Sequence, residues 1–232
     1  RPDTITREKL EALKAGGVTR ISINPQTLSD QVLQNIGRLH TAQDVLDAFA
    51  LAGAAGFTDI NCDLIVGLPG DSLAGFEKTL EGVLALGPSN VTVHSLALKR
   101  AARIEAEGGT GLHKKQEETA AMMGYSIRRL TEEGYAPYYL YRQTRMAGNL
   151  ENTGWAKPGF ACRYNIYTMD ECTSVVACGA GGVTKLKDPY SGRLERIFNF
   201  KYPAEYISRH GEILDRKDGV TRLYEQFRKR LH

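Results

Sequence analysis

One acidic residue lies in a stretch that is otherwise mostly apolar. Residues 60–69 read Ile-Asn-Cys-Asp-Leu-Ile-Val-Gly-Leu-Pro and are predicted to form a buried strand followed by a turn, because Gly67 has no side chain and Pro69 stops a strand. In parallel α/β folds, side chains at the carboxyl ends of strands face the crevice where ligands bind. Asp63 is therefore a candidate ligand-binding carboxylate, with the turn backbone close to the ligand; its alternative role is to cap that turn.

Other polar residues lie on neighbouring predicted strands. Gln26 follows strand 18–24, so we expect it beside Asp63 on the same rim, where its amide offers both a donor and an acceptor. His94 lies on strand 90–97, where a core or rim histidine and a catalytic histidine both fit the sequence. Three aromatic residues fit sheet packing: Tyr138, Tyr139 and Tyr141.

These residues are positioned by strands and helices that alternate along the first half of the chain. Apolar spacing predicts helices over residues 6–15, 29–36, 42–55, 72–86 and 114–133. Three predicted strands alternate with these helices, at residues 18–24, within 60–69 and at 90–97. Their spacing is that of βαβ units, which join parallel strands by right-handed crossovers. This part is expected to be half of a barrel or of an open α/β sheet, with a loop at residues 101–111.

The second half has a different character. After Gly134 the sequence is aromatic and rich in β-forming residues, and it predicts strands over residues 138–141, 164–169, 173–178 and 194–200, then helices over residues 203–209 and 218–231. We therefore expect an α/β fold with two domains. Residues 1–112 would form the C-terminal half of a partial parallel (β/α) barrel, and residues 113–232 a smaller α+β region.

Composition limits the classes of function. The 232 residues include 30 basic and 27 acidic side chains, for a net charge of +3, spread along the chain. This gives no electrostatic footprint for nucleic acid, and no apolar run is long enough to span a bilayer. The four cysteines occur singly, which argues against a zinc knuckle or a disulfide framework. We expect a cytoplasmic protein without a nucleic-acid partner or a membrane span.

Several motifs point to one family. In order, they are residues 17–22 (Gly-Val-Thr-Arg-Ile-Ser), Gln26, residues 36–40 (Ile-Gly-Arg-Leu-His), 61–69, 92–100, 148–152, 156–159 and 179–185. This set resembles the oxygen-independent coproporphyrinogen III oxidases, or coproporphyrinogen dehydrogenases, of the radical S-adenosylmethionine (SAM) enzymes. The resemblance covers nearly the whole chain, and it implies the radical SAM type of barrel.

The sequence departs from that family in one respect. The family's Cys-x3-Cys-x2-Cys motif, which binds a four-iron four-sulfur cluster, does not occur here, and neither does the glycine-rich motif after the second strand. The sequence also begins with Arg1, directly at a helix-start signal. We therefore expect a fragment that contains no metal ligands of its own, with the cluster cysteines upstream, and that is inactive as cut.

The resemblance implies roles for five residues. Arg38 would bind the carboxylate of SAM, since a guanidinium can bond both oxygens; alternatively it is a surface arginine after a helix. Asp63 would bind the ribose diol or the ammonium group, and Gln26 the sugar or the amino-acid part. The backbone of Ala97 would meet adenine, and the backbone around Lys185 would close over the cofactor from the second domain.

The resemblance also implies an activity. Coproporphyrinogen III would lose carbon dioxide from two propionates and become protoporphyrinogen IX, through a 5′-deoxyadenosyl radical and with an electron-donor protein as partner. Cationic side chains would hold the propionates of this tetrapyrrole, and the candidates are Lys99, Arg100 and Arg142. Two alternatives stay open, namely a haem-binding chaperone of the same family and a barrel enzyme of unrelated chemistry.

Overall fold

The computed structural model describes residues 1–96, 109–141 and 151–229, with side chains from residue 116 onward in the second of these ranges. The chain divides into two compact units, Arg1–Cys162 and Arg163–His232. This division falls later than the predicted boundary after residue 112, because the long helix and the strands that follow it pack with the first three strands. Within the described residues, no helix has both the length and the apolar character that crossing a membrane requires.

The first unit is built on a five-stranded sheet of order β1-β2-β3-β5-β4. Its strands are β1 (Arg20–Ser22), β2 (Asp59–Val66), β3 (Asn90–Ser95), β4 (Ala136–Tyr141) and β5 (Asn152–Ala156). The first three are parallel, which confirms the predicted βαβ alternation. Strand β5 pairs antiparallel with both β3 and β4. The sequence analysis missed β5, because Gly154 lies at its centre and glycine is unfavourable inside strands.

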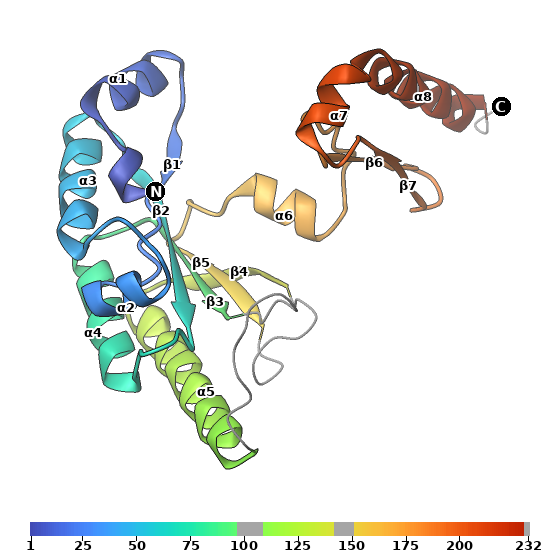
Figure 1. Cartoon of the computed structure of the whole chain (residues 1–232). Coiled ribbons are helices and arrows are strands. Elements are labelled where there is room, and N and C mark those ends of the chain that lie inside the picture. Colours follow the sequence, from blue (N-terminus) through green and yellow to red (C-terminus); the bar gives the residue numbers. More distant parts are fainter. Residues whose placement is uncertain (97–108, 142–150, 230–232) are drawn as a thin grey trace. The chain divides into compact units, whose positions relative to one another are not determined.

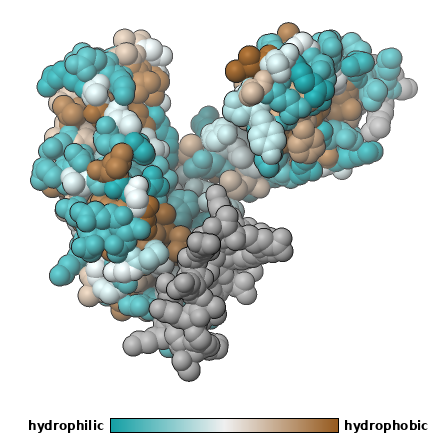
Figure 2. Space-filling view, viewed as in Figure 1, coloured by the Kyte–Doolittle hydropathy of each residue, from teal (hydrophilic) through white to brown (hydrophobic). Residues whose placement is uncertain are grey.

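Helices cover one face of this sheet (Figure 1). They are η1 (Pro2–Thr4), α1 (Arg7–Ala15), α2 (Asp30–Asn35), α3 (Ala42–Ala54), α4 (Leu73–Ala85) and α5 (Gly109–Glu132). Side-chain oxygens of Thr6, Ser29, Thr41 and Ser72 accept backbone hydrogen bonds at the starts of α1, α2, α3 and α4, and Thr41 forms a full capping box with Asp44. The outer surface of these helices mixes hydrophilic and hydrophobic side chains (Figure 2).

The strands separate apolar from polar side chains. On β2, Ile60, Cys62, Leu64 and Val66 point into the helix-covered core, with Val91 and Val93 of β3 beside them. Because side chains alternate along a strand, the intervening residues of both strands point to the other face. That second surface, here called the polar face, carries Asp59, Asn61 and Asp63 of β2 together with Asn90, Thr92 and His94 of β3.

The second unit contains α6 (Arg163–Met169), β6 (Val183–Lys187), β7 (Leu194–Phe198), α7 (Pro203–Ser208) and α8 (His210–Lys229). Strands β6 and β7 form an antiparallel pair. The predicted strand 194–200 and the predicted helix 203–209 are confirmed within one or two residues. Buried apolar side chains in this unit include Leu186, Phe200, Ile213 and Phe227.

Three predictions for this unit were wrong. Residues 164–169 form helix α6 instead of a strand, since β propensity expresses packing on a sheet and Tyr164 and Tyr167 remain exposed. Residues 173–178 make a single bridge, from Val175 to Lys185. The last helix begins at His210 rather than at residue 218, because Gly211 and Gly219 interrupt the helical pattern without breaking the helix.

Candidate functional site

An irregularity between β1 and β2 brings two predicted site residues together. Ser22 pairs with Asn61, but the next bridge joins Gln26 to Leu64, so the segment after β1 has one more residue than β2 in this interval. The backbone N–H of Gln26 donates to the backbone carbonyl oxygen of Asp63 at 3.0 Å. The backbone N–H of Ile65 donates to the backbone carbonyl oxygen of Gln26, also at 3.0 Å. Gln26 has a φ of 70°, an uncommon value for a residue other than glycine. Such irregularities often redirect side chains next to active sites.

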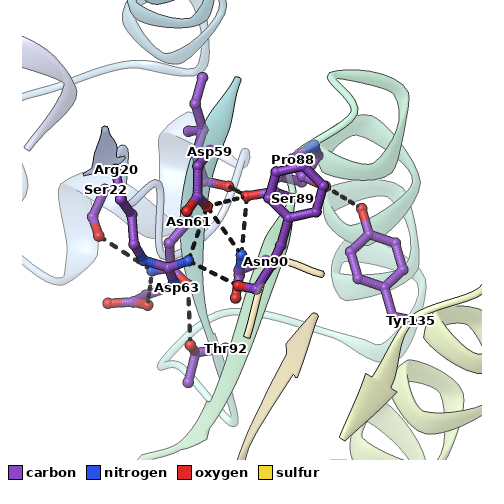
Figure 3. Close-up of polar contacts among 12 residues, drawn as sticks. Arg20, Ser22, Asp59, Asn61, Asp63, Pro88, Ser89, Asn90, Thr92 and Tyr135 are labelled. Carbon is purple, nitrogen blue, oxygen red and sulfur yellow. Dashed lines mark hydrogen bonds and ion pairs between the residues drawn. The ribbon is translucent and has the colours of Figure 1, made fainter. Parts of the chain in front are cut away.

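Asp63 is the centre of a hydrogen-bonded cluster on the polar face (Figure 3). Its carboxylate accepts hydrogen bonds from the Asn24 side chain at 2.7 Å and the Asn61 side chain at 2.8 Å. Nε2 of His94 lies 3.8 Å from Oδ1, which is an electrostatic contact rather than a hydrogen bond. Burial alone raises the pKa of the Asp63 carboxyl, but His94, Asn61 and Thr92 together lower it below its usual value. Asp63 is therefore an anion at neutral pH.

His94 connects Asp63 to strand β4. The Tyr141 hydroxyl lies 3.2 Å from Nδ1 of His94, and Tyr139 reaches Thr92 at 3.4 Å between hydroxyl oxygens. The structure therefore places His94 on the rim of the sheet, in contact with a predicted ligand-binding acid. Two of the three tyrosines predicted to pack in the sheet, Tyr139 and Tyr141, thus lie on the polar face as well.

A second polar cluster lies at the amino ends of the same strands (Figure 3). Asp59 accepts hydrogen bonds from Arg20 at 2.9 Å, from Ser89 at 2.6 Å and from Asn90 at 3.3 Å. Residues at this end of barrel strands generally serve stability, whereas ligands bind at the carboxyl ends. Sequence reasoning missed this cluster, as it missed Asn24 and Asn61. The alternation of polar and apolar residues along β2 was the available signal.

Arg38 and His40 lie in the loop after α2. Arg38 is half-buried, and no acid in the described part of the chain forms an ion pair with it. His40 is buried, and its Nε2 lies 3.0 Å from the Pro25 carbonyl oxygen. A carbonyl can only accept, so Nε2 carries the proton. This bond ties the loop of Arg38 to the segment that holds Gln26.

The remaining predicted site residues lie outside the described ranges or in the second unit. Ala97, Lys99, Arg100 and Arg142 lie outside the described residues. Lys185 belongs to the second unit, so its predicted role stays a prediction. There its ammonium pairs with Glu171 at 2.5 Å, and its backbone amide and carbonyl both bond to Val175.

The turn after β2 packs closely against helix α5. Gly67 has a φ of 78°, and a Cβ at this position would lie 2.9 Å from the Thr119 hydroxyl oxygen. Thr119 is a buried residue of α5. A side chain at position 67 would therefore collide with Thr119, and the close approach of a ligand to this backbone stays a prediction.

Comparison with known proteins identifies the family. A model described as the radical SAM superfamily matches residues 1–83. Over 217 residues, the chain is 39% identical to the oxygen-independent coproporphyrinogen-III oxidase-like protein HemZ of Bacillus subtilis; the match covers 94% of this chain and 43% of HemZ. The chain belongs to the radical SAM superfamily. Its sequence and fold are HemZ- and HemN-like.

Two further relatives extend this result. The heme chaperone HemW of Bacillus subtilis is 31% identical over 185 residues, which are 78% of this chain and 45% of HemW. The structure of coproporphyrinogen III oxidase (HemN) from Escherichia coli has a TM-score of 0.63 and 19% identity, over 90% of this chain and 48% of that protein. The HemN match confirms the predicted fold class. The chain spans less than half the length of these relatives.

The superfamily implies SAM and an iron-sulfur cluster, and the described residues fit only the first. No three His, Cys, Asp or Glu residues in the described part are placed to hold a metal ion. Cys62 points into the apolar core, where burial raises the pKa of its thiol. For SAM, in contrast, Asp63 offers a carboxylate. Beside it, Oδ1 of Asn24 is buried without a hydrogen-bond partner among the described residues. This radical SAM chain can thus offer acceptors to an ammonium group or a ribose.

Proposed function

We propose that Asp63, Gln26 and Arg38 bind SAM at the carboxyl ends of β1 and β2. The observation that carries this proposal is the anionic Asp63 beside the backbone-fixed Gln26. Asp63 would accept hydrogen bonds from the ribose hydroxyls or the ammonium group, and Arg38 would bond the carboxylate. The side-chain amides of Asn24 and Asn61 already fix the orientation of the Asp63 carboxylate. Little side-chain freedom is therefore lost when SAM binds.

The activity that we propose for the protein containing this chain is oxygen-independent decarboxylation of coproporphyrinogen III. The 39% identity to a coproporphyrinogen-III oxidase-like protein supports it. SAM, when bound with a reduced cluster, supplies a 5′-deoxyadenosyl radical. A propionate chain of the substrate would lose one hydrogen atom to that radical, then carbon dioxide and one electron, and become a vinyl group. An electron-donor protein would reduce the cluster, and a separate electron acceptor would take up the one electron that the substrate releases with each carbon dioxide.

This chain's residues have a limited part in that chemistry. They would bind the polar groups of SAM, fix its position above the sheet and exclude water from the reacting atoms, while the cofactor supplies the difficult step. Lys99, Arg100 and Arg142 stay candidates for binding the substrate propionates. The residues of the second unit, including Lys185, stay candidates for covering the site.

A haem-binding chaperone is the second candidate. The 31% identity to a protein named heme chaperone supports this alternative. Such a protein would share the SAM-binding residues and differ in the tetrapyrrole that it binds. Similarity to both kinds of relative makes a direct assay necessary.

The test uses the full-length protein, with its cluster reconstituted without oxygen. Coproporphyrinogen III, SAM and a reductant are added, and protoporphyrin is measured after oxidation of the product. We expect two molecules of carbon dioxide and two of 5′-deoxyadenosine for each protoporphyrinogen. A stable haem complex in a protein that forms no protoporphyrinogen would instead support the chaperone.

A further inference from the structure

The polar face has an aromatic part beside the Asp63 cluster. Tyr139 and Tyr141 are alternate residues of β4, so their side chains leave the same side of the strand. Their ring planes are parallel within 3°, and the ring centroids lie 6.3 Å apart. That separation is close to the ~6.7 Å between alternate residues of a strand. We call this pair of parallel rings the tyrosine floor.

Glycine allows this floor to lie against the sheet. A Cβ built at Gly154 of β5 would lie 1.8 Å from Cε1 of Tyr139 and 2.4 Å from its Cδ1. The Tyr139 ring thus covers the backbone of the neighbouring strand, in a space that any larger residue would fill. From there it reaches β3, where its hydroxyl meets Thr92.

The hydroxyl groups of both rings contact residues of β3. Tyr141 contacts His94, which itself lies against Asp63. Burial raises the pKa of Tyr139 to about 12, so its phenol keeps its proton at neutral pH. The rings are held at the edge of the strands that carry the proposed SAM site, and both are only half-buried.

The polar face is therefore divided between two kinds of surface. Strands β1, β2 and β3 present amides, hydroxyls and a carboxylate, which suit the ribose and amino-acid groups of SAM. Strand β4 presents flat, neutral aromatic rings, which suit another flat ring. His94 lies at the border between the two surfaces.

We propose that the tyrosine floor binds one pyrrole ring of the tetrapyrrole substrate, next to SAM; this inference rests on the proposed function. A porphyrinogen has saturated bridges between its pyrroles, so each small ring is flat although the macrocycle is not. A floor two tyrosine rings long therefore matches a single pyrrole better than the whole macrocycle. A propionate on that pyrrole would then extend toward the polar part of the same face.

The test compares substitutions in the full-length protein. Tyr139→Phe and Tyr141→Phe keep the flat rings, whereas Tyr139→Leu and Tyr141→Leu remove them. Leu140→Ala is the control, because Leu140 lies between the two tyrosines in β4 and is 57% exposed. Equilibrium binding of coproporphyrinogen III and of SAM is measured separately for each variant without oxygen, as is the yield of protoporphyrinogen. Thermal unfolding shows which variants remain folded.

If the tyrosine floor binds the substrate, the leucine variants should lose affinity for coproporphyrinogen but not for SAM. Each leucine variant should bind coproporphyrinogen about tenfold more weakly, as expected when a stacked aromatic contact is lost. SAM affinity should stay unchanged, and the phenylalanine variants and Leu140→Ala should bind substrate within about threefold of the wild type. Leucine variants that bind substrate normally, or that lose affinity for SAM instead, would overturn the inference.

The two proposals fail in different ways. If coproporphyrinogen binds through the floor but no product forms, the proposed activity is wrong and the floor stands. If product forms and the leucine variants keep the wild-type substrate affinity, the floor is wrong and the activity stands. If the wild-type protein binds no coproporphyrinogen, both are wrong.

Discussion

Replacing Gly154 by alanine gives a quantitative test of how Tyr139 packs on the sheet. The backbone of Gly154 does not have a positive φ, so alanine is conformationally allowed there. Its methyl carbon would, however, lie 1.8 Å from Cε1 of Tyr139. Carbon atoms in contact are ~3.5–4.0 Å apart, so the ring must move by about 2 Å. That movement would break the contact between Tyr139 and Thr92.

Overpacking of this kind typically costs about 1–3 kcal/mol of unfolding free energy. For a protein of this size, each kcal/mol corresponds to roughly 2–4 °C, so we expect the melting temperature to fall by about 2–12 °C. The assay is thermal and chemical unfolding of the wild type, Gly154→Ala, Tyr139→Ala and the double variant. Without the ring, alanine at position 154 should be neutral or slightly stabilising.

The reasoning is refuted if the double-mutant cycle gives a coupling energy below about 0.5 kcal/mol, the scatter for independent sites. Gly53→Ala is the matched control. Gly53 lies in α3, and a Cβ there would meet no atom within 4 Å. Alanine at that position should stabilise the protein by about 0.5–1 kcal/mol, as in other exposed helix interiors.

Three further predictions concern strand β2. Asp59→Asn removes the charge that pairs with Arg20, and it should lower the unfolding free energy by about 1–3 kcal/mol in denaturant titrations. Because the pKa of Asp63 is lowered in the folded state, its ionised form stabilises the protein above the unfolded pKa of about 4, and this contribution is lost as the pH falls through the folded pKa. The stability difference between the wild type and Asp63→Asn should therefore be constant above about pH 5 and shrink in more acidic solution; a difference that does not shrink at all as the pH is lowered from about 5 to about 3 would contradict this. Cys62 is buried with a raised pKa, so a thiol reagent at pH 8 should label the exposed Cys172 and leave Cys62 unmodified in the native protein, as mass spectrometry of peptides would show.

The sequence predicted the parts of the fold that depend on local pattern. The spacing of apolar residues located α3, α4 and β2, because one face of each packs in the core. Asp63 could be singled out because an acid in a buried strand is costly unless it is paired or functional. In the structure its partners lie on β2, on β3 and in the segment after β1, which is consistent both with a paired acid and with a functional acid.

Features that depend on partners distant in the chain could not be predicted. Strand β5 forms by pairing with β3 and β4, and no local propensity encodes that pairing. The pairing of Gln26 with Leu64 likewise depends on one extra residue between Ser22 and Gln26, which shifts the register by one residue. Helix α6 contains aromatic residues typical of strands, and none of its residues is buried.

The central claim is that Asp63 marks a SAM site at the carboxyl end of β2. It is tested most directly by the dissociation constant of SAM for the full-length protein and for two matched variants, Asp63→Asn and Asp59→Asn. Both change an acid to its amide on the same face of the same strand, Asp59 at its amino end and Asp63 past its middle. We expect Asp63→Asn to weaken SAM binding by roughly ten- to a hundredfold, the loss of a hydrogen bond to a charged group, and Asp59→Asn to leave it unchanged. Equal affinities in the Asp63→Asn variant and the wild type would contradict the account.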